Sequence, residues 1–363
     1  MTRSEKKKRY DGMLIFVVLL LVAAGLVILY STSAYNGQVK FHDPFHYLKK
    51  QGFATLLGLF GMALIARVDY HKWVPLAIPA YVTSIILSVA VIFFGDEYNG
   101  SKRWLSLGPI SFQPSEFAKV AVILFLAWQI ERTKKATMGF GFMCRTILTL
   151  LPIIGLVGSN NLSTAIIILG IGGILIFVSN PGYLEFIGLG SAGAGFIAVF
   201  LAAESYRLER LAIWRNPEKY EKGFQTIQGL YAIGSGGIFG RGFGNSLQKL
   251  GFVPEAQNDM IFSIICEEMG AAGAIFLIFL FAMLLWRLGV AAMHAKDLAG
   301  ALICCGIMGH LALQVILNIA VVTNTIPNTG ITLPFISYGG TSAVFLLGEM
   351  GLAMNVGKCD RIN

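Results

Sequence analysis

Apolar runs of about 20 residues recur along almost the whole 363-residue chain, and a run of that length crosses a bilayer as a helix. Hydrophobic residues make up 55% of the sequence and charged residues only 13%, about half the charged share of a soluble domain. We therefore expect an all-α polytopic membrane protein rather than a soluble domain with one anchor. The ten expected transmembrane helices are 13–33, 51–66, 74–94, 115–130, 143–157, 162–179, 183–203, 260–286, 298–323 and 333–356.

The fifth and sixth spans are predicted to be separate helices. A single helix over 143–179 would be about 55 Å long, whereas the hydrocarbon core of a bilayer is about 30 Å thick. The polar break Ser159-Asn160-Asn161 stands where a turn is needed. Two short spans joined at this break fit the bilayer.

The distribution of lysine and arginine sets the expected orientation. Most of these residues outside one long segment fall in the basic segment 1–12 and in the loops that the span order places on the same side. The positive-inside rule then puts both termini in the cytoplasm. The long segment, 204–259, forms one large extracellular loop between helices 7 and 8, and 1–363 is a single membrane domain. The net charge of +8 follows from this bias, so nucleic acid is not an expected partner.

The large loop contains the glycine-rich stretch GSGGIFGRGFGNS, residues 234–246. Glycine allows close backbone approach, and clustered backbone N–H groups can hold a phosphate. The stretch is not a P-loop, because no Gly-Lys-Ser/Thr follows. Arg241 and Lys249 make an anionic ligand one interpretation, and a flexible loop is the alternative.

Polar side chains are also expected inside the spans. Glu116 and Lys119 lie three residues apart on one helix face, either as an ion pair that locks the bundle or as the floor of a polar cavity. His310, Gln314 and Asn318 repeat every four residues, so they form a stripe along one helix. Hydrogen bonding between helices is the simpler account of that stripe.

Four carboxylates gather in FVPEAQNDMIFSIICEEMG, residues 252–270: Glu255, Asp259, Glu267 and Glu268. An aspartate at a helix start suits an N-cap, but one cap does not explain four acids. Carboxylates at a membrane surface also suit general-base chemistry on a hydroxyl, or coordination of a divalent cation beside a phosphate ligand. These residues predict an outward-facing polar site.

Several long segments together resemble the SEDS family (shape, elongation, division and sporulation), whose members include FtsW, RodA and SpoVE. The amino-acid sequence of the loop segments is closer to the division and sporulation branch than to the elongation branch. The matching segments are NGSKRWLSLGPISFQPSEFAK (99–119), WRNPEKY (214–220), GFQTIQGLYAIGSGGIFGRGFGNSLQKL (223–250), VPEAQNDMIFSIICEEMG (253–270) and LPFISYGGTSA (333–343).

This resemblance implies a peptidoglycan glycosyltransferase that polymerises lipid II, an undecaprenyl-pyrophosphate disaccharide-pentapeptide, at the outer face of the bacterial plasma membrane. It implies Asp259 as the catalytic general base and Glu116–Lys119 as the intramembrane acid–lysine pair. The expected substrate-binding residues are Glu255, Arg241, Lys249, Trp104, Arg103, Asn258 and Ser337.

Further expectations concern cofactors and partners. A divalent cation, Mg²⁺ or Mn²⁺, is a candidate ligand of Asp259 and Glu255, and no organic cofactor is expected. The expected partners are a class B penicillin-binding protein transpeptidase and other division proteins, at the division septum. The alternatives are a lipid II flippase and a non-catalytic scaffold of the division machinery.

The sequence departs from the family pattern in two places. Many relatives read Pro-Asp-Leu-Gly-Thr where this chain reads Asn160-Asn161-Leu162-Ser163-Thr164, and Asn324 stands where relatives often carry glycine. We therefore assign no role to the connection between the fifth and sixth spans.

Overall fold

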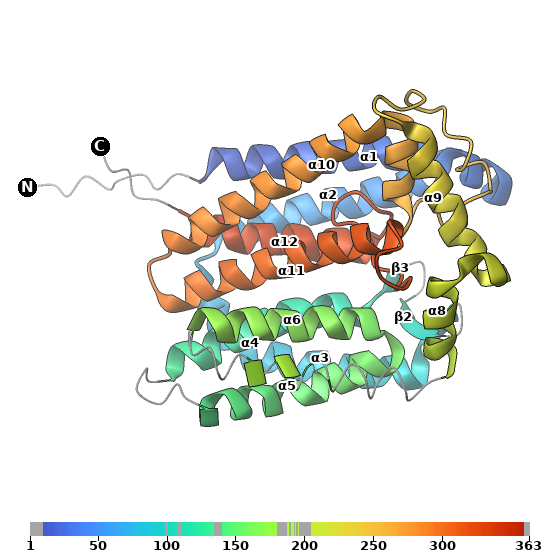
Figure 1. Ribbon diagram of the computed structural model, residues 1–363. Helices are drawn as coiled ribbons and strands as arrows, with labels where there is room; N and C mark the ends of the chain where they lie inside the picture. Colours follow the sequence, from blue (N-terminus) through green and yellow to red (C-terminus); the bar gives the residue numbers. More distant parts are fainter. Residues whose placement is uncertain are drawn as a thin grey trace, which may run out of the picture.

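The computed structural model describes residues 10–98, 101–107, 110–133, 140–179 and 205–358, with isolated positions between 187 and 195. Long helices lie roughly side by side in a bundle (Figure 1). At one end of the bundle α1 begins and α12 ends. At the other, which we call the loop end, lie α8, α9 and the labelled strands.

The helices and strands have the following bounds. The bundle contains α1 (Gly12–Phe41), α2 (His46–Arg67), α3 (Ala77–Phe94), α4 (Pro114–Arg132), α5 (Phe140–Asn160), α6 (Leu162–Ser179), α10 (Ile261–Met293), α11 (Leu298–Val322) and α12 (Gly340–Val356). The loop end adds α8 (Ser205–Arg215), α9 (Phe224–Gly236) and the strands β1 (Asp96–Tyr98), β2 (Ser101–Leu107) and β3 (Ile110–Phe112).

Membrane helices are confirmed, although the count of ten is not. Within the described residues, six helical segments are long and apolar enough to cross a bilayer: Gly12–Phe41, Tyr70–Phe94, Gly141–Asn160, Leu162–Ser179, Ile261–Met293 and Leu298–Val322. The expected spans 51–66 and 115–130 coincide with α2 and α4, which carry more polar residues. The expected span 183–203 lies almost wholly outside the described residues. The last helix begins at Gly340 rather than 333, because the residues before it form turns.

The predicted break between the fifth and sixth spans is confirmed. α5 ends at Asn160 and α6 begins at Leu162. Asn161 Oδ1 accepts a hydrogen bond of 3.2 Å from Thr164 N, so Asn161 caps the start of α6. An asparagine side chain can satisfy an N–H group that a new helix leaves without a partner, and this allows the chain to turn here.

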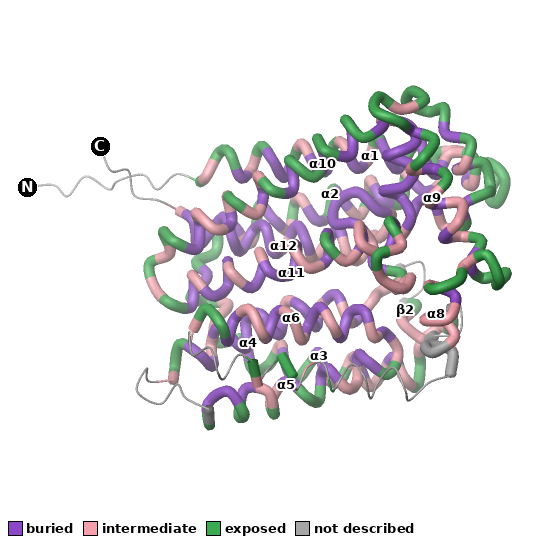
Figure 2. Tube along the Cα trace, viewed as in Figure 1, coloured by how far each residue is buried: buried purple, intermediate pink, exposed green. Residues whose placement is uncertain are grey.

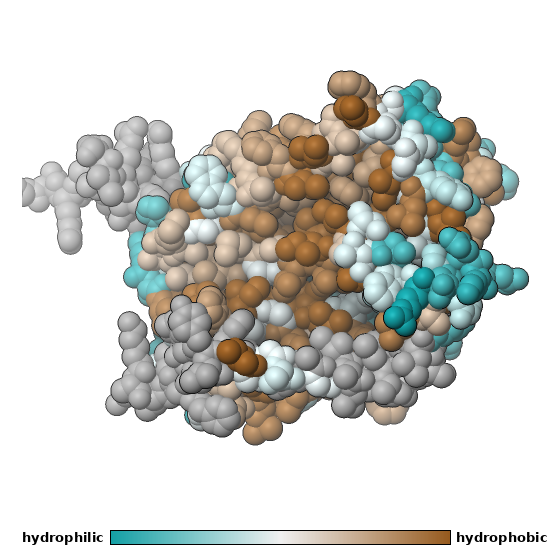
Figure 3. Space-filling model, viewed as in Figure 1, coloured by the Kyte–Doolittle hydropathy of each residue, from teal (hydrophilic) through white to brown (hydrophobic). Residues whose placement is uncertain are grey.

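Buried residues line the inner faces of the helices, and apolar residues also cover much of the outside (Figures 2 and 3). The outward side chains include Phe93, 71% exposed, and Phe94, 80% exposed. In Figure 3 the hydrophilic side chains gather toward the two ends of the bundle. This distribution fits a bundle surrounded by lipid.

A small sheet at the loop end was not predicted. The strands pair antiparallel in the order β1-β2-β3, with Asp96 opposite Trp104 and Leu105 opposite Phe112. The strands are short and lie between two apolar runs, so the sequence pattern of the spans hides them. Because successive side chains on a strand point to opposite faces, β2 sends neighbouring residues in two directions.

Candidate functional site

Asp259 lies at the loop end, in the turn just before α10. The side chains that act on it come from three other elements: Arg103 from β2, Arg210 from α8 and Gln225 from α9. Gln225 Nε2 lies 3.4 Å from Asp259 Oδ1. Asp259 keeps part of its surface exposed, although many atoms surround its carboxyl group.

A side chain from α11 fixes the backbone of Asp259. Asn318 is fully buried, and its Nδ2 donates to the carbonyl oxygen of Asp259 at 2.9 Å and to that of Ile331 at 2.7 Å. The predicted polar stripe on α11 therefore forms hydrogen bonds between segments, as expected. Its last member also holds the backbone of the candidate base in place.

The environment raises the pKa of the Asp259 carboxyl to about 6. Burial is the main cause, because it penalises the charged form, and the negative charge of Glu255 adds to it. Arg210 and Arg103 act in the opposite direction and lower the pKa. A carboxylate with a pKa near 6 is ionised at neutral pH and is a better proton acceptor than an ordinary aspartate.

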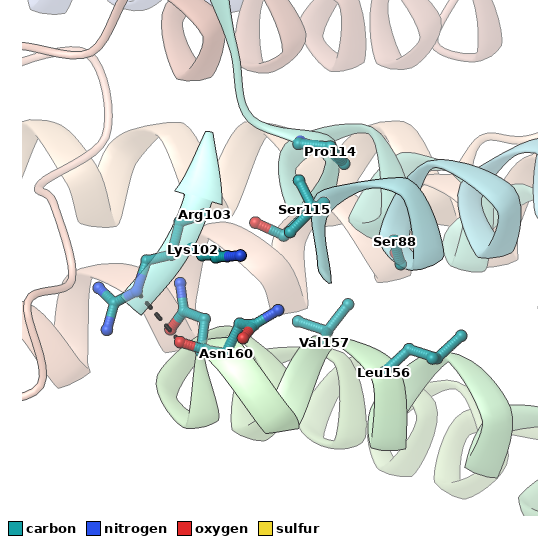
Figure 4. Close-up of a pocket in the computed structure, with 10 residues that line it drawn as sticks. Ser88, Lys102, Arg103, Pro114, Ser115, Leu156, Val157 and Asn160 are labelled. Atoms are coloured by element: carbon teal, nitrogen blue, oxygen red, sulfur yellow. Dashed lines mark hydrogen bonds between the residues drawn. The ribbon is translucent and has the colours of Figure 1, made fainter. Parts of the chain in front are cut away.

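The two arginines are held by backbone carbonyl groups of other segments. Arg103 Nε donates to the carbonyl oxygen of Asn160 at 3.2 Å (Figure 4), and Arg210 Nη1 donates to that of Asn328 at 3.1 Å. A Cβ added at Gly330 would lie 3.8 Å from both Arg103 Nη1 and Asp259 Oδ2. The guanidinium group of Arg103 and the carboxylate of Asp259 therefore face the same small space.

Glu255 and Asn258 form a tight turn beside Asp259. Glu255 adopts a left-handed backbone conformation with φ 54°, and its carbonyl oxygen accepts from Asn258 N at 2.9 Å. Asn258 Nδ2 also donates to Glu255 Oε2. The turn orients Glu255 close enough to influence the Asp259 carboxyl, which agrees with the grouping predicted for these two acids.

The two expected metal ligands, Glu255 and Asp259, lie beside two arginines. Within the described ranges, no three histidine, cysteine, aspartate or glutamate side chains gather closely enough to hold an ion. Two arginines act on Asp259, and their positive charge opposes a resident cation. The arrangement suits an anionic ligand better than a metal, so the expected Mg²⁺ or Mn²⁺ stays a prediction.

Glu267 and Glu268 have a different role from Asp259. Glu268 Oε1 lies 2.6 Å from Lys249 Nζ, which also donates to Ser31 Oγ at 3.0 Å. Glu267 Oε1 lies 3.4 Å from Arg241 Nη1. Both glutamates are buried, so these pairs compensate charges inside the protein. Arg241 and Lys249, which the sequence assigned to substrate, bind these internal carboxylates.

The glycine-rich stretch packs its backbone directly against α10. The helix is interrupted at Gly270, which has φ 67°. Ala271 N and Ala272 N donate to the carbonyl oxygens of Gly237 and Ile238, at 2.9 and 3.0 Å. In return the Glu267 and Glu268 carbonyl oxygens accept from the backbone N–H groups of 241 and 242, also at 2.9 and 3.0 Å. The glycines thus allow close contact between two backbones, and these N–H groups are not free to hold phosphate.

Two further expected residues lie apart from these contacts. Trp104 stands on β2, one residue beyond Arg103, and is partly exposed. Ser337 is buried, and its Oγ accepts from Leu333 N at 2.8 Å. Ser337 therefore closes a turn before α12, whereas the side chain of Trp104 remains accessible.

A buried polar network crosses the middle of the bundle. Lys119 Nζ lies 2.9 Å from Glu116 Oε1 and 3.1 Å from Gln314 Oε1. His310 Nε2 lies 2.9 Å from the same Gln314 oxygen, and its Nδ1 lies 2.9 Å from Glu349 Oε2. The ion-pair interpretation of Glu116 and Lys119 is thus confirmed. Glu349 was not among the predicted residues of this network, although an acid within an expected span was a signal.

The sequence matches a family model and named relatives over nearly its whole length. Residues 11–362 match the model of a family described as cell cycle protein, with FtsW, RodA and SpoVE as its members. Stage V sporulation protein E of Bacillus subtilis (strain 168) is 39% identical, over 98% of this chain and 99% of that protein. A probable peptidoglycan glycosyltransferase FtsW of Geobacter sp. (strain M18) is 34% identical, over 96% of each chain.

Solved structures are similar to this chain both in fold and in sequence. A chain of a peptidoglycan synthase complex, solved for its coordination of polymerization and crosslinking, superposes with a TM-score of 0.81 at 30% identity, covering 96% of this chain and 97% of that one. The rod shape determining protein RodA of Thermus thermophilus gives a TM-score of 0.72 at 30% identity, covering 98% of each chain.

Proposed function

Because this chain belongs to the SEDS family of FtsW, RodA and SpoVE proteins, we propose that it is a peptidoglycan glycosyltransferase that polymerises lipid II. Relatives named as probable peptidoglycan glycosyltransferases support the activity. The observation that carries the mechanism is the pairing of one aspartate of raised pKa with two arginines at one end of a membrane bundle.

In the proposed reaction Asp259 acts as the general base. Its carboxylate takes the proton from a sugar hydroxyl of the acceptor while that oxygen attacks the anomeric carbon of the donor. A glycosidic bond forms, and the bond from the anomeric carbon to the pyrophosphate oxygen breaks. Assistance of this kind is worth roughly 10²–10⁴-fold in rate. Asn318 holds the Asp259 backbone, so the base needs little reorganisation.

The leaving group is a lipid pyrophosphate, and its growing negative charge needs positive partners. Arg103 and Arg210 are the cations that act on Asp259, and both are oriented by carbonyl groups. Guanidinium groups bind phosphate oxygens with two parallel hydrogen bonds. We therefore assign this stabilising role to Arg103 and Arg210 rather than to Arg241 and Lys249, the cations predicted to bind substrate.

The test is polymerisation of purified lipid II by the full-length protein together with a class B penicillin-binding protein. Asp259→Asn should lose at least about 10²-fold in rate, because the amide cannot accept the proton. Glu218→Gln removes an exposed acid from the same segment and is the matched control. Full activity of the Asp259 variant would overturn the assignment.

A flippase is the rival function, and a scaffold is the third. A flippase needs polar groups that reach both ends of the bundle, and the buried network of Glu116 and His310 supplies some in the middle. Glu116 and His310, however, are already paired with Lys119 and Glu349. Lipid scrambling by the protein alone in vesicles would favour the flippase, and normal wall synthesis by the Asp259 variant would favour the scaffold.

The setting of this activity is also proposed. Both termini lie in the cytoplasm, the loop end and the segment 204–259 face outward, and the protein works at the division septum. A class B penicillin-binding protein cross-links the strands, together with other division proteins. The synthase complex that this chain resembles, which coordinates polymerization and crosslinking, supports such a partnership.

A further inference from the structure

Large apolar side chains are exposed on the segment that joins α9 to α10 at the loop end (Figure 1). They are Ile238, Phe239, Phe243, Leu247, Leu250 and Phe252. The charged residues of 237–253 are Arg241 and Lys249, and both pair with buried glutamates of α10. An exposed apolar surface of this kind marks a contact with lipid or with another protein.

The chain ahead of α9 has the opposite character. Its exposed charged residues are Glu218, Lys219, Glu221 and Lys222. Exposed charges of both signs are typical of a surface in water. The chain before α9 therefore suits water, whereas the chain after it suits an apolar medium.

Two contacts between α1 and α10 show how deep the glycine-rich stretch lies in a bilayer. At one end of the bundle Arg287 Nε donates to Asp11 Oδ2 at 2.9 Å, and at the other Ser31 Oγ donates to Glu268 Oε1 at 2.8 Å. Along each helix these two levels are about 30 Å apart, which is the thickness of a hydrocarbon core. Neither helix carries a charged residue between them. The level of Ser31 and Glu268 is therefore the border of the hydrocarbon at the loop end.

Exposed aromatic side chains mark the same two levels. Trp286 stands next to Arg287 and is 61% exposed, and Tyr30 stands next to Ser31 and is 37% exposed. Tryptophan and tyrosine are enriched at both interfaces of a bilayer, where a ring with an apolar body and a polar atom fits. The positions of these rings therefore agree with the two borders.

The glycine-rich stretch is bonded to α10 at the border of the loop end. Its N–H groups at 241 and 242 donate to the carbonyl oxygens of Glu267 and Glu268. Its carbonyl oxygens at 237 and 238 accept from the N–H groups of Ala271 and Ala272. The backbone of Phe239 lies between these bonds, so it is held at the same depth. The side chain of Phe239 is 83% exposed and points away from the protein there.

This apolar surface continues into the lipid-facing side of α10. Ile275 and Phe276 follow Ala271 and Ala272 by one turn, on the same side of the helix, and both are exposed. The exposed side chains of the stretch thus extend a surface that faces lipid. At this depth the surrounding medium is hydrocarbon, so lipid is the expected occupant rather than a partner protein.

We propose that Ile238, Phe239 and Phe243 insert into the lipid leaflet at the loop end and anchor the glycine-rich stretch there. Gly240 has φ 77°, which lets the chain turn sharply after Phe239. The anchor holds by apolar contact with acyl chains and needs no particular lipid headgroup. Its value to the reaction rests on the proposed function, because the anchor would keep Asp259 level with the lipid-linked sugar.

The experiment measures the depth of a nitroxide label on the full-length protein, in liposomes that contain no other protein. The label is attached to a keto amino acid at position 239, so the five native cysteines stay in place. Oxygen concentrates in hydrocarbon and a neutral nickel complex in water, so the ratio of their collision rates with the label reports its depth. The ratio at 239 should be several times that of a label replacing the exposed Glu218, and close to that of a label replacing Phe276 on α10.

Two results at position 239 would overturn the proposal. A label that collides mainly with the nickel complex would place the side chain in water, where it awaits a protein partner. A label that neither reagent reaches would show that a second copy of the chain covers the surface. Because no sugar is transferred in this assay, either result would leave the glycosyltransferase assignment standing.

A second measurement tests whether these side chains hold the stretch in place. With the label at 243, the double variant Ile238→Gln with Phe239→Gln should lower the oxygen-to-nickel ratio several-fold, because glutamine removes the apolar contact with lipid. Tyr220→Gln removes an exposed aromatic side chain from the charged segment before α9 and should leave the ratio unchanged. Equal thermal unfolding of the variants in detergent checks that the fold is intact. An unchanged ratio in the double variant would overturn the anchoring role.

Discussion

Lys249 Nζ and Glu268 Oε1 lie 2.6 Å apart, and both side chains are almost completely buried. This pair joins the segment after the glycine-rich stretch to α10, and Ser31 brings in α1. Removing one partner of a buried pair leaves an uncompensated charge. The pair is therefore expected to stabilise the loop end against unfolding.

Lys249→Met should lower the free energy of unfolding by about 3–5 kcal/mol. Thermal unfolding in detergent measures it. The double variant Lys249→Met with Glu268→Leu should recover part of the loss, because no charge is then buried alone. If Lys249→Met unfolds like the wild type yet binds lipid II poorly, the sequence-based assignment to substrate would be right instead.

The rate of polymerisation should depend on the protonation of Asp259. Its carboxyl must be ionised to accept a proton, so kcat/KM should fall as the pH drops below about 6. Glu255 raises this pKa, so Glu255→Gln should move the acid limb to lower pH. Arg210 lowers it, and Arg210→Gln should move the limb to higher pH. An acid limb that neither substitution shifts would assign the titration to another group.

Gly270→Ala should destabilise the protein. Gly270 has φ 67°, and an added Cβ would lie 2.4 Å from both Gly240 N and the carbonyl oxygen of Ile238. With ψ −170° as well, Gly270 lies in a backbone region essentially restricted to glycine, which costs a residue with a side chain about 1–3 kcal/mol. The control is Gly234→Ala in α9, where an added Cβ meets nothing within 4 Å and alanine favours the helix. Equal thermal stability of the two variants would contradict this account.

Glu349 should be essential for stability. His310 Nδ1 lies 2.9 Å from Glu349 Oε2, and its Nε2 lies 2.9 Å from the Gln314 oxygen that Lys119 also contacts. Glu349→Gln removes a buried carboxylate from this network and leaves its hydrogen-bond partner with a weaker acceptor, so it should cost about 1–3 kcal/mol. Adding His310→Gln should restore part of the loss. Thermal unfolding of the single and double variants tests the coupling, which additive losses would rule out.

The membrane helices can be predicted from the sequence because a long apolar run by itself indicates a helix surrounded by lipid. The break at Asn160-Asn161 was predictable for the same reason, since bilayer thickness limits the length of one helix. The short strands were not, because β1 to β3 lie between two long apolar runs and have no strong pattern of their own.

The candidate site was predicted only in part. The acids Glu255 and Asp259 are close in sequence, so one turn brings them together. The partner of each cation depends on how distant segments pack. Glu267 and Glu268 enter the buried part of α10 and need compensation, which Arg241 and Lys249 supply. Buried acids in an expected span were the signal that those two cations had internal partners.

The interruption at Gly270 divides α10 into a shorter and a longer helical segment. After the break, two backbone N–H groups of α10 donate to the carbonyl oxygens of residues 237 and 238 in the glycine-rich stretch, instead of to carbonyl groups of the helix. We expect a change in tilt of the longer segment, forced by a thinner or thicker bilayer, to be taken up at Gly270. The shorter segment begins beside Asp259, so the direction of the carboxylate would then not depend on the thickness of the membrane.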